Sequence, residues 1–426
     1  MYMTLRDRPG HGGPNRPRAA VRRVSGTVVL LGTVSLLTDV SSEMVASVLP
    51  LYLTAVVGLS PIAYGFLDGI YQGASALVRI AGGYASDRSQ RPKWVAAAGY
   101  GTSALSRLAM LPAADFAAIT TVIAADRLGK GLRTAPRDSL IAAASQPDVL
   151  GRAFGVHRTL DTFGAAIGPL IAFALLATVP GSYDSIFVVS FAFAIAGVAV
   201  LVLFVPDLPT AAGTGRAGLR RVIAGVTGRN LRRPLLAAAL LGLLTIGDGF
   251  LYLSLQDRDD FAARYFPLLY VGTNVAYLAL AVPLGRLADR VGRGRVLVAG
   301  HLALLGGYLL AALPGGGVGL TLTVLLLLGT FYAATDGVLA ALASRLVAAS
   351  ARGSGIAAAQ TTVVLARFAA SVLFGLLWSL QGPRPALLLF AALLAGAVPV
   401  AAWLLHGIDR PAAPTPTEPR TSGVPR

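Results

Sequence analysis

The sequence predicts an all-α integral membrane protein with twelve transmembrane helices in two pseudo-symmetric six-helix bundles. Apolar residues make up 55% of the 426 residues and charged residues only 13%, whereas soluble domains carry roughly 25% charged residues. The mean hydropathy is +0.68, and long apolar runs recur along the chain. One charged motif also occurs twice, with its aspartates at Asp87 and Asp289, 202 positions apart. Together these features favour lipid as the solvent and an internal repeat.

Twelve segments are long and apolar enough to be spans, because a bilayer-crossing helix needs about 20 mostly apolar residues. They are residues 27–53, 61–84, 94–112, 116–138, 153–178, 184–205, 235–256, 264–287, 295–313, 318–347, 354–380 and 385–406. The first run continues through Asp39 and Glu43 to Tyr52 without a small-x-small cleavage site. We therefore expect a retained helix rather than a signal peptide.

Loops that contain basic residues alternate with loops that contain none, and this pattern predicts the orientation of the chain. The N-terminal tail and the loops after spans two, four, eight and ten carry Arg or Lys, whereas those after spans one, three, five and nine carry none. By the positive-inside rule both termini are expected in the cytoplasm. The Ala-, Arg- and Gly-rich composition is typical of a GC-rich bacterium, so we expect the bacterial inner (cytoplasmic) membrane.

The longest interior gap divides the spans into halves. Residues 206–234 hold six Arg and one Asp and lie on the basic side. The predicted organisation is a basic cytoplasmic tail at 1–26, an N-terminal bundle at 27–205, a cytoplasmic linker at 206–234, a C-terminal bundle at 235–406 and a disordered, Pro-rich cytoplasmic tail at 407–426.

The repeated motif reads G-x-x-x-D-R-x-x-R-x-(K/R), as GYASDRSQRPK at 83–93 and GRLADRVGRGR at 285–295. Each copy lies between the second and third spans of its half. A carboxylate there stabilises the positive end of a neighbouring helix, and the following Arg can pair with an acid. This predicts a cytoplasmic gate; the alternative, loop anchoring at the headgroups, does not explain the repeated spacing. The predicted gate residues are Gly83, Asp87, Arg88, Arg91, Arg137, Asp138, Gly285, Asp289, Arg290 and Arg293.

These motifs resemble those of the major facilitator superfamily over nearly the whole chain, although Gln90 replaces the usual Gly of the first copy. Arg127 and Gly131 follow the superfamily's R-x-x-x-G pattern in span four. Span five is similar to the G-x8-G-x3-GP pattern of proton-coupled exporters, with Ala172 where a further Gly is expected. Its predicted packing residues are Gly155, Gly164, Gly168 and Pro169. The resemblance implies the major facilitator fold and proton-coupled efflux.

Ionisable side chains within spans cost about 2.5–3.5 kcal/mol each on insertion scales, so they usually face a cavity or a partner. Asp39 is expected near the midplane, with Glu43 one turn outward on the same face. This pair is a candidate proton or cation site; the alternative is structural neutralisation by Arg residues of other helices. The predicted proton-coupling or cavity residues are Asp39, Glu43, Asp126, Arg127, Lys130, Arg133, Asp161, Asp248 and Asp336.

Further expectations concern the partners of these charges. Asp161 is expected to pair with Arg133 or Arg127, and the superfamily resemblance implies a role in proton transfer for Arg127. Charged residues are fewer in the second half, so proton handling is expected in the first. Interhelix pairs are expected for Asp68, Arg79 and Arg107.

Other function classes fit the sequence poorly. GKG at 129–131 lacks the flanking residues of a phosphate-binding loop, and no nucleophile–base–acid set is visible, so no enzyme is expected. The net charge of +16 comes from loops between apolar runs, which argues against nucleic acid. With no Cys and four His, no metal site is predicted.

We therefore expect a secondary active transporter working by alternating access. Its predicted activity is proton-coupled efflux of a small organic molecule or drug, with the proton gradient as energy source and no cofactor. The alternatives are uptake or exchange of a small anionic solute, suggested by Lys130, Arg133 and Arg137, or metal-ion export. The expected partners are the substrate, protons and the lipid bilayer, and the protein is expected to be a monomer.

Overall fold

The computed structural model describes residues 24–89, 91–146, 148–208, 229–336, 338, 342 and 352–406. Within these ranges it leaves aside the side chains of residues 75–77, 79–89, 229–230 and 352–358. Both predicted tails, apart from a few residues, and most of the predicted linker lie outside the described residues.

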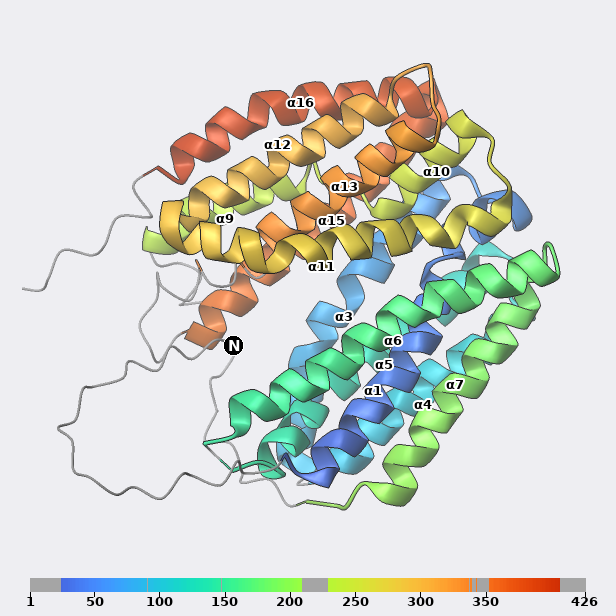
Figure 1. Cartoon of the computed structure of the whole chain (residues 1–426), viewed down its shortest axis with the longest axis vertical. Coiled ribbons are helices and arrows are strands. Elements are labelled where there is room, and N and C mark those ends of the chain that lie inside the picture. Colours follow the sequence, from blue (N-terminus) through green and yellow to red (C-terminus); the bar gives the residue numbers. More distant parts are fainter. Residues whose placement is uncertain are drawn as a thin grey trace, which may run out of the picture.

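The described chain confirms the all-α fold, and each of the twelve predicted spans contains helix among its described residues (Figure 1). The first half consists of α1 (Gly26–Ala46), the short α2 (Leu49–Leu51), the π-helix η1 (Tyr52–Val56), α3 (Pro61–Ser89), α4 (Pro92–Ala109), α5 (Phe116–Ala143), α6 (Leu150–Thr178) and α7 (Tyr183–Phe204). The second half consists of α9 (Arg229–Gly242), α10 (Asp248–Asp259), the 3-10 turn η2 (Ala263–Tyr265), α11 (Phe266–Val291), α12 (Arg293–Ala311), α13 (Val318–Thr335), α15 (Arg352–Gln381) and α16 (Pro383–Leu404).

Eight helical segments among the described residues are long and apolar enough to cross a membrane by length and composition alone. Helices such as α5 fall short because charged side chains interrupt them, as expected for spans that face protein partners. Local sequence sets several helix starts. The Asp115 carboxylate caps α5 by accepting from the Ala118 N–H at 2.8 Å, and α3 and α4 begin at Pro61 and Pro92.

The helices of each half run alternately up and down and pack side by side. In the first half α1 packs between α6 and α7, while α5 packs against α3 and α4; in the second half α13 packs against α11 and α12. We call one end of the molecule the basic end; it is the end of Gly26, Ser89, Leu150, Arg229 and Val291. The opposite end, where Val56, Pro61, Thr178, Asp259 and Val318 lie, is called the distal end.

The structure corrects the predicted continuous span at 235–256. Helix α9 begins earlier, within the predicted linker, and ends at Gly242; α10 begins only at Asp248. Unwound backbone at membrane depth needs internal hydrogen-bond partners. Tyr308 of α12 supplies them, because its hydroxyl accepts from the Ile246 N–H and donates to the Leu244 carbonyl, both at 3.0 Å. The break is therefore stabilised by specific hydrogen bonds from α12.

The two halves contact each other at the distal end. Three glycines of α3 (Gly65, Gly69 and Gly73) face α15, and a Cβ added at Gly65 would overlap the Ser371 carbonyl. At the same end, the Phe173 ring of α6 stacks on that of Tyr265 with centroids 6.0 Å apart. In Figure 1, α6 and α11 approach at the distal end and diverge towards the basic end. The described form therefore has a closed distal end.

Candidate functional site

A cluster of charged side chains crosses the middle of the first half. Helix α5 supplies most of the basic members, and α1 and α6 bring acids to them. The members are Asp39, Glu43, Asp126, Arg127, Lys130, Arg133, Arg137, Asp138, Arg158 and Asp161, with Arg107 from α4. Most of the predicted proton-coupling residues are thus brought together in one place.

The centre of this cluster is a pair of carboxyl groups from two helices. Asp39 of α1 and Asp161 of α6 lie within hydrogen-bonding reach of each other. Their side chains are 14% and 18% exposed, so neither is sealed from solvent. Arg133 Nη2 lies 3.7 Å from Asp39 Oδ1, and Arg137 Nη1 lies 4.0 Å from Asp161 Oδ1. Two acids therefore share a site that two guanidinium groups partly neutralise.

The expected partners of Asp161 were wrong. The carboxylate lies beside Arg137 and, at 3.2 Å, beside Arg158 of its own helix, instead of Arg133 or Arg127. The reason is the antiparallel packing of the two helices: Asp161 lies nearer the basic end of α6, which is level with the later turns of α5. Arg133 pairs with Asp39 of α1 instead.

The span-five glycines explain how the two carboxyl groups meet. A Cβ added at Gly164 would overlap the Leu36 carbonyl, and one at Gly168 would lie 2.7 Å from the Val40 carbonyl oxygen. Both contacts are to the backbone of α1, so α6 approaches α1 as closely as two helices can. Gly155 differs, because no described atom lies within 4 Å of its added Cβ. Only the later part of the predicted packing motif sets the separation between Asp39 and Asp161.

The Arg127 guanidinium contacts two neighbouring side chains, Asp126 and Tyr71, that the sequence did not identify as its partners. Its Nε donates to Asp126 Oδ2 at 2.9 Å, and its guanidinium lies over the Tyr71 ring, 3.7 Å from the centroid. The charge of Glu43 reaches both Arg127 and Lys130. Lys130 is only partly buried, in contrast to Arg127 and Arg133 of the same helix.

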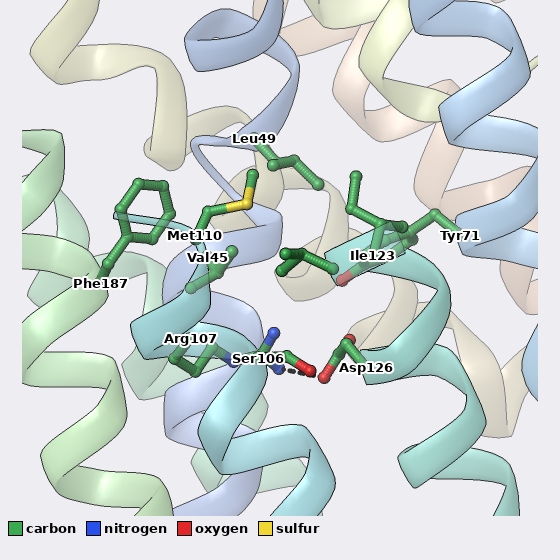
Figure 2. A pocket seen from close by; sticks show the side chains of 10 residues that line it. Val45, Leu49, Tyr71, Ser106, Arg107, Met110, Ile123, Asp126 and Phe187 are labelled. Atoms are coloured by element: carbon green, nitrogen blue, oxygen red, sulfur yellow. Dashed lines mark ion pairs between the residues drawn. The ribbon is translucent and has the colours of Figure 1, made fainter. Parts of the chain in front are cut away.

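Figure 2 shows another interhelix pair of this cluster, with Arg107 and Asp126 pointing toward each other. Arg107 Nη2 lies 2.9 Å from Asp126 Oδ1 and also donates to the Ser42 hydroxyl at 3.2 Å. Both side chains line a cavity of about 20 Å³ that is otherwise mostly apolar, with Met110 and Phe187 in its wall. That volume suits a single water molecule. Sequence analysis anticipated an interhelix pair for Arg107 but not its partner.

His157 joins the site through a residue that sequence reasoning missed. Its Nε2 lies 2.8 Å from the hydroxyl of Ser35, one turn before Asp39 on α1. The imidazole is only 4% exposed. No sequence signal marks a lone serine in an apolar helix as a polar partner.

The predicted gate residues lie at the basic end. The backbone of Gly83, Asp87 and Arg88 belongs to α3, but their side chains, like that of Arg79, lie outside the described residues. In the second copy Arg293 Nη2 lies 2.9 Å from Asp289 Oδ1 of the same motif.

The remaining gate residues belong to the two motifs or to the end of α5. Gly285 and Arg290 belong to α11, and Arg91 precedes α4. Asp138 pairs with its neighbour Arg137 at 3.0 Å. A gate role for these residues stays a prediction.

A smaller polar group occupies the second half. Asp248 is the first residue of α10, and its Oδ1 accepts from the Tyr332 hydroxyl at 2.5 Å. Arg367 of α15 lies beside the Phe331 and Tyr332 rings, at 5.7 and 5.9 Å. Asp336 lies just after α13 and is exposed. The predicted sites Asp248 and Asp336 thus lie apart from the first-half cluster.

Within the described ranges, no three His, Asp, Glu or Cys side chains are grouped so that they could hold a metal ion. Acids and bases of the first-half cluster alternate instead. Such an arrangement is suited to exchanging protons and ion-pair partners.

Comparisons with known proteins agree with this architecture. The sequence profile of the Major Facilitator Superfamily matches residues 31–273 and 258–425. An uncharacterised MFS-type transporter of Methanocaldococcus jannaschii is 30% identical over 374 residues, which cover 84% of this chain and 90% of that protein. An uncharacterised protein of Mycobacterium tuberculosis is 31% identical over 171 residues, covering 40% of this chain and 41% of that protein.

Solved structures share the fold at low sequence identity. The nucleoside transporter NupG superposes with a TM-score of 0.78 at 14% identity, covering 89% of this chain and 99% of that one. The human organic anion transporter TETRAN superposes with a TM-score of 0.62 at 17% identity, again covering 89% and 99%.

Proposed function

The chain belongs to the Major Facilitator Superfamily and is a multi-pass membrane transporter, and we propose that it exports a small organic molecule or drug in exchange for protons. The observation that carries the proposal is the Asp39–Asp161 pair, which joins α1 to α6 within a ring of basic side chains. The proton gradient is then the energy source, without any cofactor.

Two carboxyl groups in hydrogen-bonding reach can hold one proton between them. When that proton leaves, two negative charges face each other in a poorly solvated place, where repulsion is much stronger than in water. Arg133 and Arg137 of α5 can compensate these two charges only while α5 stays close to α1 and α6. Proton binding is thereby linked to helix arrangement, which is what alternating access requires.

The glycine packing of α6 supports this reading. Because Gly164 and Gly168 touch the α1 backbone, a small movement of α6 changes the separation of the two acids directly. Lys130 and Glu43 lie about one turn nearer the distal end than Arg133 and Asp39, and they are the groups placed to meet a polar substrate.

Uptake or exchange of a small anionic solute is the second candidate. Lys130, Arg133 and Arg137 favour it, because they recur along one helix in the middle of the first half. The solved relatives transport nucleosides in one case and organic anions in another, and at their low identity they support the fold alone.

We also propose that the protein resides in the bacterial inner membrane, with the basic end in the cytoplasm. The Arg-rich loops of that end support this orientation by the positive-inside rule.

The test uses purified protein in liposomes that contain a pH-sensitive dye, challenged with drugs, organic anions and divalent metals. Entry of one compound class should drive protons out of the lumen. Asp39→Asn and Asp161→Asn should each reduce this coupled flux at least about tenfold, equivalent to about 1.4 kcal/mol. Asp184→Asn, which alters an exposed acid at the distal end, is the matched control.

Full coupled flux in both variants would contradict the assignment. Solute entry without opposing proton movement would favour anion exchange or facilitated transport, with Lys130 as the residue to test next.

A further inference from the structure

A buried acid outside the proposed proton site lies on the contact between the two halves. Asp68 of α3 is 8% exposed, and its carboxyl lies against Gly247, where an added Cβ would overlap it. One turn earlier, the Tyr64 hydroxyl occupies the space that a Cβ at Gly249 would need. Side chains of the first half thus fill two glycine positions at the break of span seven. We call this contact of α3 with α10 and α15 the seam.

The second half supplies the partners of this carboxyl group. The Ser371 hydroxyl of α15 donates to Asp68 Oδ2 at 2.6 Å. Gly247 is the N-cap of α10 and has no side chain with which to cap that helix. The Asp68 carboxyl therefore lies beside the start of α10, whose first turn already carries the acid Asp248. Gln72 of its own helix also forms a hydrogen bond with this carboxyl group.

Other ionisable groups that face Asp68 come from three elements of the second half and from α3 itself. The Asp248 carboxyl of α10 repels it, whereas Arg367 of α15 attracts it. Tyr270 of α11 and Tyr64 of α3 are the neighbouring phenols. The Ser371 hydroxyl and Arg367 stabilise the charge of Asp68, whereas its burial and the Asp248 carboxyl at the start of α10 oppose that charge.

We propose that Asp68 is a second proton-binding site of the transporter, located on the seam, whose protonated form holds the distal end closed and whose charged form favours opening. A carboxylate buried between the halves is poorly solvated and faces the Asp248 carboxyl, so its charge destabilises the closed seam. Protonation removes that charge and leaves a neutral carboxyl group in the seam. Opening the distal end exposes Asp68 to the solution on that side, where water solvates its charge and it can exchange its proton.

The position of the site supports a role in the closure itself. It lies between halves, in contrast to the Asp39–Asp161 pair, which lies within the first half. The seam continues along α3, where Gly65 approaches the backbone of α15. A change in the charge of Asp68 therefore acts on the contact that separates when the distal end opens.

The experiment measures the width of the distal end directly. The chain contains no cysteine, so Val179→Cys and Val318→Cys introduce the only two thiols. Both positions are exposed, at 57% and 77%, and they lie at the distal ends of different halves. Spin labels there report the distance between the halves in lipid nanodiscs, by pulsed electron resonance.

The parent protein should show a shorter mean distance at mildly acidic than at mildly alkaline pH. Asp68→Asn, which is nearly isosteric and still accepts from Ser371, should show the shorter distance at both pH values because it cannot become charged. Asp184→Asn should keep the parental response. An unchanged distance and pH response in Asp68→Asn, in monodisperse protein, would overturn the proposal.

A second variant guards against a local folding defect. Gly247→Ala should lengthen the distance at both pH values, because the added methyl overlaps the Asp68 carboxyl. Gly396→Ala, where no described atom lies within 4 Å of the added Cβ, is its control. Parental distances in Gly247→Ala would refute the seam as described. None of these readings needs a substrate, so their failure is distinct from failure of the proposed transport activity.

Discussion

Tyrosine hydroxyls show how single residues stabilise charges and backbone at membrane depth. Tyr332 donates to Asp248, and Tyr308 serves two backbone groups of the unwound segment between α9 and α10. Each replaces water for a polar group that lipid cannot solvate. Tyr100 is as deeply buried as Tyr308 but has another role, because its ring lies 4.4 Å from the Arg133 guanidinium.

The contrast between two of these tyrosines gives a prediction. Tyr308→Phe leaves the Ile246 N–H and the Leu244 carbonyl unsatisfied, which costs about 1–3 kcal/mol per group. Tyr100→Phe should be nearly neutral, because the Tyr100 hydroxyl has no hydrogen-bond partner among the described residues and Phe keeps the ring. Melting temperatures in detergent compare the two; equal losses would contradict the role given to Tyr308.

At the scale of elements, the two halves use their first spans differently. Helix α1 runs unbroken through Asp39 and Glu43 and is fixed by close backbone contact with α6. The corresponding span of the second half is broken, and its α10 begins against a carboxyl group of α3. The repeat therefore shares a topology, while the chemistry at its centre differs between the halves.

The span-five motif contains its own control for a test of helix approach. Gly164→Ala places a methyl group against the Leu36 carbonyl. Because a helix backbone cannot move away as a flexible side chain can, this overlap should reduce the free energy of unfolding by about 1–3 kcal/mol. Transport in liposomes should fall sharply as α6 moves away from α1 and Asp161 from Asp39. Gly155→Ala should retain transport, since no described atom lies near its added Cβ. Similar activity in both variants would show that the approach of α6 to α1 is not required.

At the scale of the molecule, two six-helix halves meet at the distal end and diverge towards the basic end (Figure 1). Contacts such as Phe173 on Tyr265 close the distal end. The first-half cluster and the seam lie on different parts of this arrangement. Proton binding at one would adjust helices within a half, and proton binding at the other would adjust the contact between halves.

The orientation of the whole molecule is testable with single cysteines. Val318→Cys at the distal end should react with a membrane-impermeant maleimide in intact cells. Val291→Cys at the basic end, also exposed, should react only after the membrane is permeabilised. The reverse pattern would mean that the basic end faces outward, against the positive-inside rule.

Several features of the site were accessible from sequence because they depend on local spacing. The depth of Asp39 follows from its position within an apolar run, and Gly164 and Gly168 are recognisable by their interval. The break in span seven was missed, although Gly242 and Gly247 flank it, because the run remains apolar through the break. Whether such a segment unwinds depends on Tyr308, 62 residues away from Ile246 in sequence.

The sequence by itself determined the solvent, the number of spans and the two-fold repeat. These follow from composition and run length, because each span must satisfy its own backbone hydrogen bonds in lipid. Only the tertiary structure decided which charges meet: Asp39 with Asp161, Arg107 with Asp126, and Asp68 with Ser371 across the halves. The reason is that the rotation of each helix, and hence the neighbour its side chains face, is set by packing between segments far apart in the chain.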